Sequence, residues 1–243
     1  PFSVAGKQLG EKDERNLFND AIDIIAVAQP RAVMIENVRG FLGAVFHDYR
    51  EKLKTQLDKL GYRTDWRLLN ASDFGVPQLR PRVVIVAIRK DRAEHFDWPE
   101  AHPHNPPTVG ETLRDLMAAR GWRGADDWAD KVDEIAPTIV GGSKKHGGPD
   151  LGPTRARAAW ATLGVEGRTL AVEAPDPFHN GMPRLTVPMV ARIQGFPDDW
   201  HFTGAKTNAY RQVGNAFPPP VAEAVSAQIA RALRKRLLHS VAG

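Results

Sequence analysis

The sequence predicts an α/β protein with a loop-rich module inserted between two more regular blocks. Residues 13–29 and 48–60 have apolar side chains at the 3–4 spacing of amphipathic helices. Residues 32–35 and 83–88 are short, continuous apolar runs, which are typical of strands buried on both faces of a parallel sheet. Between residues 93 and 185 Pro, Gly, His and Trp are frequent and periodicity is poor, which indicates the inserted module.

The boundaries of these elements follow from capping and turn residues. Asp13 or Asn16 can cap the start of the first helix, and Gly61 suits the left-handed position after the second. Residues 62–69 are expected to be extended. Regular structure resumes at Val187–Ile193, and a last helix is expected over residues 219–238. Helices that alternate with strands in this way are the pattern of an α/β fold.

Composition excludes several classes of function. The chain has 243 residues and no cysteine, so disulfides, thiolate metal sites and a cysteine nucleophile within it are excluded. Its net charge is 33 − 29 = +4, which is compatible with a nucleic-acid partner without requiring one. There is no apolar run of the ~20 residues that a membrane span needs, and the first residues lack the apolar core of a secretory signal. We therefore expect a cytoplasmic protein.

Polar residues next to the predicted strands are candidates for chemistry. Glu36 directly follows the first apolar run, at the expected carboxyl edge of the sheet, where ligands bind in open α/β folds. A lone glutamate there is more often an exposed loop residue or a cap. Gln78, Arg80 and Arg82 occupy alternate positions, so an extended backbone would point all three to one face. That face suits an anion or a nucleobase edge, or else a solvated edge with surface ion pairs.

Two glycine-containing turns lie near the end of the chain. Gly214 permits either a positive φ or a close approach of backbones, and Asn215 can hydrogen-bond a polar ligand. The corner at residues 194–198, Gln-Gly-Phe-Pro-Asp, is typical of a turn that packs an aromatic ring. Either segment alone would be interpreted as an ordinary turn.

Taken in order, these segments resemble the DNA cytosine-5 methyltransferase family. The segments are Pro1-Phe2-Ser3, Leu17-Phe18, Glu36-Asn37-Val38, Gln78-x-Arg80-x-Arg82, Arg192 through Pro197, and Gly214-Asn215. Their order and approximate spacing make the resemblance specific, because each motif alone is only moderately so. The resemblance implies part of a doubly wound, Rossmann-like methyltransferase sheet. Residues 1–93 would be the C-terminal half of the catalytic domain, 94–183 a target-recognition domain, and 184–243 a return to the catalytic domain.

The resemblance also implies a reaction. In that family a cysteine in a Pro-Cys-Gln motif adds to C6 of cytosine, and C5 then takes a methyl group from S-adenosyl-L-methionine. The target base must leave the duplex, so base flipping is implied. Pro-Phe-Ser follows the family's Pro-Cys-Gln, so this chain would begin just after it. It would then lack the nucleophile and most of the cofactor site, and we expect the isolated chain to be inactive.

Individual residues acquire roles from the same resemblance. Glu36 resembles the glutamate that contacts N3 and N4 of cytosine and favours protonation at N3. Arg82 resembles the arginine that holds O2 of the base, and Gln78 and Arg80 resemble its partners near the flipped nucleotide. The positions that match those flanking S-adenosyl-L-methionine are Leu17, Asn215 and Ala216. No metal is implied.

The inserted module is the expected DNA-reading part. Residues 142–168 carry five basic and two acidic side chains, namely Lys144, Lys145, Arg155, Arg157 and Arg168 against Asp150 and Glu166. We expect Lys144, Lys145, Arg155 and Arg157 to bind double-stranded DNA, mostly through phosphates. For any one of them a solvated surface charge is the alternative interpretation.

Three interpretations remain open at the level of the sequence. The first is a truncated or split DNA methyltransferase of a restriction-modification system, whose partner would be an N-terminal complementary fragment or subunit. The second keeps the fold but makes RNA the substrate; the sizeable insert favours DNA, since sequence readout needs such a module. The third is a non-catalytic DNA-binding remnant, which the absence of cysteine suits, although Glu36, Arg80 and Arg82 suit a once-complete active site.

Overall fold

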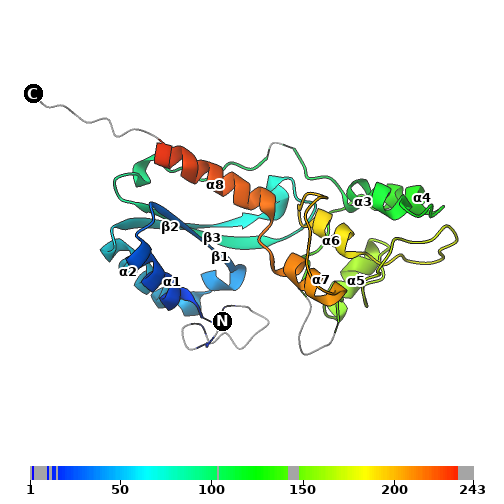
Figure 1. Ribbon diagram of the computed structural model, residues 1–243, viewed down its shortest axis with the longest axis horizontal. Coiled ribbons are helices and arrows are strands. Elements are labelled where there is room, and N and C mark those ends of the chain that lie inside the picture. Colours follow the sequence, from blue (N-terminus) through cyan, green and yellow to red (C-terminus); the bar gives the residue numbers. More distant parts are fainter. Residues whose placement is uncertain are drawn as a thin grey trace, which may run out of the picture. The chain divides into compact units, whose positions relative to one another are not determined.

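The computed structural model describes residues 2, 10, 13–14, 16–102, 104–141 and 148–234. The chain divides into two compact units (Figure 1). The first comprises Pro1–Leu69, Pro81–Glu100 and Glu223–Gly243, and the second comprises Asn70–Arg80 and Ala101–Ala222. The predicted division at residues 93 and 183 rests on the family resemblance and stays a prediction.

The first unit is built on a three-stranded sheet. Its strands are β1 (Ala32–Val38), β2 (Tyr62–Asn70) and β3 (Pro81–Arg89), in the order β1-β3-β2. β1 and β3 pair antiparallel, from Ala32 opposite Ile88 to Val38 opposite Arg82. The expected parallel sheet is therefore wrong for this pair, because an apolar run reports burial and not strand direction. The run in β3 is buried throughout, whereas β1 is mostly half-buried.

Helices cover the sheet of the first unit. α1 (Phe18–Ala28) and α2 (His47–Lys59) lie on one side of it, and α8 (Pro219–Arg234) lies on the other (Figure 1). α1 begins at Phe18, five residues later than the predicted start at residue 13. Asn16 Oδ1 accepts a hydrogen bond from the Phe18 amide at this start. Gly61 has φ of +89°, as expected for the residue after α2. The described part of the chain thus confirms the predicted helix-strand-helix-strand order and the α/β class.

Aromatic rings fill the space between α1, α2 and β3. The ring of Phe2 is buried, with its centroid 5.2 Å from that of Phe41 and 5.0 Å from that of Phe46. Phe41 and Phe46 lie in two short 3₁₀ turns, η2 (Arg39–Leu42) and η3 (Ala44–Phe46). The edge-to-face arrangement is the one that aromatic pairs prefer. The family-like segment that begins the chain is therefore anchored in the core by its phenylalanine.

The second unit is helical. Its elements are η4 (Ala71–Phe74), α3 (Val109–Ala118), α4 (Ala125–Lys131), α5 (Thr154–Thr162), α6 (Val187–Ile193) and α7 (Lys206–Asn215), while η5 (Ala93–His95) belongs to the first unit. The insert is thus more regular than its sequence suggests. α4 and α5 span only 7 and 9 residues, and two helical turns are too short to produce a clear period.

A single apolar core joins the insert to the C-terminal block. It contains Trp128 and Trp160 from the insert together with Val190 of α6 and Tyr210 of α7. Many of the tryptophans that suggested loops are therefore core residues. Among the residues that the structure describes, no helix combines the length and apolar character needed to cross a membrane.

Candidate functional site

Glu36 and Arg82 form an ion pair across β1 and β3. Arg82 Nε lies 2.7 Å from Glu36 Oε1, and the two side chains are 14% and 31% exposed. The register sets Glu36 opposite Val84 and Arg82 opposite Val38, so the pair is diagonal on one face of the sheet. Glu36 therefore lies inside β1, and the expectation that the strand stops at this residue is wrong. Pairing with β3 extends the strand to Val38.

The environment of the ion pair restrains the arginine. Burial lowers the pKa of Arg82 from its ordinary value, while the charge and hydrogen bond of Glu36 act against that shift. The guanidinium stays protonated, because its ordinary pKa lies far above neutral pH. Arg82 Nη1 also donates to the carbonyl of Pro81, 2.9 Å away. The pair thus combines an anchored carboxylate with a guanidinium of fixed direction.

A hollow of about 350 Å³ opens beside this carboxylate. Glu36, Asn37 and Val38 line it from β1, and Leu17 and Phe18 line it from the start of α1. Its other lining residues are Phe2, Asn16, Ala21 and Ile35. Leu17 is 68% exposed, so its apolar surface faces outward from the core. The structure thereby brings Leu17 and Glu36, which the sequence suggested for different roles, to one cavity.

Two asparagines of this hollow were not among the predicted site residues. Asn37 Oδ1 accepts from the Val38 amide at 2.8 Å, and Asn16 Nδ2 donates to the Tyr49 hydroxyl at 2.7 Å. Asn37 stands beside Glu36 in the family-like motif, which was the available signal. Asn16 is recognisable in the sequence only as a helix cap, and the tertiary fold alone places it at the cavity.

Gln78 and Arg80 do not share a face with Arg82, so that expectation is wrong. Both are buried, at 0% and 1% exposure, and both belong to the second unit. Gln78 forms an isolated bridge with Ala136 and lies outside any strand, so the alternation of an extended segment does not apply to it. Their role next to a flipped nucleotide stays a prediction.

The side chain of Arg80 bonds to backbone carbonyls instead. Nη1 donates to Ile139 O at 2.7 Å, and Nη2 donates to Gly214 O at 2.7 Å and Ala216 O at 3.0 Å. A guanidinium is costly to bury unless such bonds satisfy its donors. Arg80 thus ties two chain segments together.

The sequence analysis missed Gln194, which is the side-chain partner of Gln78. Gln78 Nε2 donates to Gln194 Oε1 at 2.6 Å, and Gln194 Nε2 donates to Ala216 O at 2.7 Å. The expected turn at this position is confirmed, since Gly195 has φ of +87° and the ring centroid of Phe196 lies 5.0 Å from that of Phe202. Nothing local in the sequence announces the bond, because Gln78 is 116 residues away.

Asn215 and Ala216 lie at the end of α7 in the second unit. Asn215 is the exposed last residue of the helix, and Ala216 follows it. Gly214 does not adopt a positive φ. It permits the alternative, a close approach of backbones, because a Cβ on Gly214 would lie 2.4 Å from Gly141 Cα.

The basic residues of the insert are only partly described. Lys144 and Lys145 lie outside the described residues. Arg155 and Arg157 lie on α5 and not in a loop; Arg155 is exposed, and Arg157 Nη2 donates to Thr154 Oγ1 at 3.3 Å. Helix α5 therefore presents at least one of the two guanidiniums to solvent.

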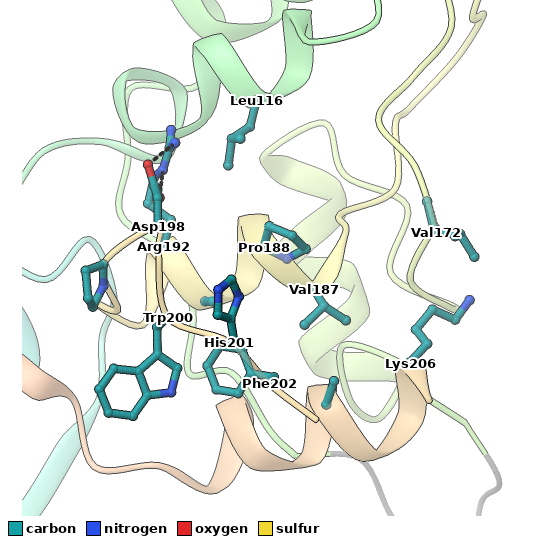
Figure 2. A pocket seen from close by; sticks show the side chains of 14 residues that line it. Leu116, Val172, Val187, Pro188, Arg192, Asp198, Trp200, His201, Phe202 and Lys206 are labelled. Atoms are coloured by element: carbon teal, nitrogen blue, oxygen red, sulfur yellow. Dashed lines mark hydrogen bonds and ion pairs between the residues drawn. The ribbon is translucent and has the colours of Figure 1, made fainter. Parts of the chain in front are cut away.

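A second hollow, of about 460 Å³, contains none of the predicted site residues. Figure 2 shows Arg192 bonded to Asp198 at one end, Lys206 at the other, and Val187 and Phe202 between them. Arg192 also pairs with Asp115, and these hydrogen bonds raise its pKa above the ordinary value. Lys206 Nζ donates to Leu170 O. The charged groups are thus already engaged within the protein. Among the described residues, no group of His, Asp and Glu could hold a metal ion.

The sequence is similar to a known family and to characterised relatives. The model of the family described as C-5 cytosine-specific DNA methylase matches residues 1–231. Type II methyltransferase M.NaeI of Lentzea aerocolonigenes is 58% identical over 237 residues, which are 96% of this chain and 57% of that protein. Type II methyltransferase M.NgoMIV of Neisseria gonorrhoeae is 50% identical over 242 residues, 97% of this chain and 75% of that protein. The chain thus spans little more than half the length of M.NaeI.

Solved structures share the fold. The Entamoeba histolytica methyltransferase EhMeth superposes with a TM-score of 0.58 at 16% identity, covering 92% of this chain and 71% of that one. The S. pombe Dnmt2 methyltransferase gives a TM-score of 0.53 at 17% identity, covering 90% of this chain and 72% of that one. At these identities the likeness concerns the fold alone.

Proposed function

The chain belongs to the C-5 cytosine-specific DNA methylase family, and on that premise we propose that it provides the cytosine-holding and DNA-reading part of a DNA (cytosine-5)-methyltransferase. The observation that carries the proposal is the Glu36–Arg82 ion pair beside a hollow that Leu17 also lines. Such an enzyme works on DNA inside the cell, so we assign it to the cytoplasm. Like its relatives, it would serve a restriction-modification system.

The ion pair suits a neutral, polar base edge. Glu36 would accept a hydrogen bond from the N4 amino group of a flipped cytosine and, when its carboxyl group is protonated, share that proton with N3, while Arg82 would donate to O2. A proton at N3 withdraws electrons from the ring and makes C6 a better electrophile. Arg82 also keeps the carboxylate in place before the base arrives, so its direction costs no reorganisation during the reaction. Both residues act on the bond-forming step more than on DNA binding.

The hollow also fits part of a cofactor. Leu17 and Phe18 offer apolar surface, and Asn16 and Asn37 offer amide groups to polar edges, which is the mixture that small-molecule sites have. S-adenosyl-L-methionine, when bound, supplies the methyl group that C5 accepts. We propose that Leu17 borders this cofactor, and that Asn215 and Ala216 of the second unit do so as well.

The nucleophile must come from polypeptide outside this chain, which has no cysteine. We propose that a complementary N-terminal segment, continuous or separate, provides the thiolate and the rest of the cofactor site. Two observations support a binding surface for it. Among the described strands, none pairs with the outer edge of β1. On α1 the apolar side chains of Ile24 and Val27 are 66% and 88% exposed.

The first test is methyl transfer itself. The purified chain, incubated with tritiated S-adenosyl-L-methionine and double-stranded DNA, should leave the DNA unlabelled, because no thiolate can attack C6. Addition of the complementary segment of the same methyltransferase should produce labelled 5-methylcytosine. Label from the chain alone contradicts the expected inactivity. Label on RNA and not on DNA would show that RNA is the substrate. If no label forms with the segment present, the result favours a non-catalytic DNA-binding protein.

The second test isolates Glu36. In the complemented protein, Glu36→Gln should lower turnover by at least about a hundredfold, the scale of a lost acid-base contribution, while DNA affinity stays near the parent value. The reason is that the amide of glutamine has no acidic proton to transfer to N3. Glu51→Gln, an exposed carboxylate of α2 in the same unit, is the matched control and should retain full activity. Parent-like turnover of Glu36→Gln would reduce Glu36 to a structural partner of Arg82.

A further inference from the structure

Two backbone segments of the second unit touch directly. They are residues 139–141, which lead toward the basic stretch of the insert, and residues 214–216 at the end of α7. A Cβ on Gly214 would lie 2.4 Å from Gly141 Cα, and a Cβ on Gly141 would lie 2.6 Å from Asn215 Oδ1. At Gly214 the obstacle is the backbone of Gly141, so only glycine fits there, whereas at Gly141 the obstacle is the exposed side chain of Asn215.

One buried guanidinium bonds to both segments. Arg80 donates through Nη1 to Ile139 O and through Nη2 to Gly214 O and Ala216 O. The rigid fork of a guanidinium fixes the directions of its N–H groups, which a lysine ammonium would not do. Arg80 therefore sets the spacing of the two segments and not merely their proximity.

Two buried glutamines close the cluster. Gln78 Oε1 accepts from the Ile139 amide at 2.8 Å and from Arg80 Nη1 at 3.5 Å. Gln194 accepts from Gln78 Nε2 and donates to Ala216 O. Gln78 and Gln194 are both 0% exposed. The three carbonyls that accept hydrogen bonds from Arg80 therefore belong to one connected network. A displacement of either backbone segment would strain the hydrogen bonds to the other.

We propose that Gln78, Arg80 and Gln194 are positioning residues that couple the cofactor side of the enzyme to its DNA side. They hold Asn215 and Ala216, proposed to border the cofactor, in register with residues 139–141. Val140 of this segment and Ala156 of α5 both lie against Gly152, and α5 carries Arg155 and Arg157, which are expected to bind DNA. The inference rests on the proposed function. It predicts that loosening the cluster weakens both ligands together, although neither ligand contacts the altered residue.

The test uses Gln194→Met, which keeps the volume of the side chain and removes its hydrogen bonds. In the complemented methyltransferase the KM for S-adenosyl-L-methionine and the Kd for cognate DNA should both rise about tenfold, the factor expected from about one buried hydrogen bond. Turnover at saturation should change little. Asn215→Ala should raise the cofactor KM alone. Leu113→Ala, a core change in the same unit, should lower Tm but leave both constants unchanged.

A second readout needs no methyl transfer. In the chain alone, Gln194→Met should accelerate amide hydrogen exchange at Ile139 and Ala216 selectively, relative to the rest of the unit. Uniform acceleration of exchange across the unit would overturn the inference, because the cluster would then contribute only to packing. Exchange rates, a cofactor KM and a DNA Kd equal to those of the parent would overturn it as well. If the parent complemented protein does not methylate, the proposed function fails. Selective exchange with weaker DNA binding by the chain would then still support the coupling, and parent-like values would reject it.

Discussion

Arg80 and Arg82 are the same residue type two positions apart, and their environments differ completely. Arg82 lies in β3 against the carboxylate of Glu36, half-buried beside a cavity. Arg80 is 1% exposed and donates to three carbonyls. Alternation along an extended chain predicted one common face. That rule holds only within a strand, and β3 begins at Pro81, between the two arginines.

The described basic residues of the insert give the sharpest test at this scale. Arg155→Ala and Arg157→Ala should each reduce the slope of log affinity against log salt by about 0.9 if the side chain contacts one phosphate. A base contact should instead cost about 1–3 kcal/mol at the cognate site only. The measurement is fluorescence anisotropy of cognate and scrambled duplexes at several salt concentrations.

A matched control exists in the same unit. Arg114 on α3 is engaged by Asp126 and Asp130, so Arg114→Ala should leave affinity and slope unchanged. If Arg155→Ala and Arg157→Ala behave like this control, α5 is a solvated surface and the DNA-reading residues lie elsewhere.

At the scale of elements, the periodic segments were predictable, including the seven-residue α6 (Val187–Ile193), whereas the short helices of the insert were not. α2, β2 and β3 lie where apolar spacing and Gly61 place them. The helices of the insert escaped prediction, since α4 has 7 residues and its tryptophan packs into a core built from distant segments. Strand direction also could not be read from the sequence, because a buried run looks the same in either orientation.

The exposed face of α1 yields a prediction about association. Val27→Lys should not lower the Tm of the chain, because this side chain is 88% exposed and buries little here. It should weaken binding of the complementary segment, since a lysine would have to be desolvated in an apolar interface. Isothermal titration of the segment measures the effect, with Glu51→Lys on the exposed surface of α2 as the control. If Val27→Lys and Glu51→Lys bind the segment equally well, α1 is not part of the interface.

For the whole molecule, family-like motifs were more informative than local physics. Glu36, Arg82 and Leu17 were placed in roles by their order along the chain, and the fold brings Glu36 together with each of the other two. The bond between Gln78 and Gln194 could not be foreseen, since glutamine is compatible with any surface turn. Its importance depends on burial, which only the assembled second unit reveals.

The length of the loops that the Arg80 cluster closes has a consequence for folding during synthesis. Ile139 follows Arg80 by 59 residues, but Gly214 and Ala216 follow it by 134 and 136. At about 5–20 residues per second, a ribosome needs roughly 7–27 s after Arg80 to deliver those last carbonyls. Until then the guanidinium has only part of its native partners and must stay hydrated. The second unit therefore cannot complete its core vectorially from the N-terminus, and this favours assembly late in translation.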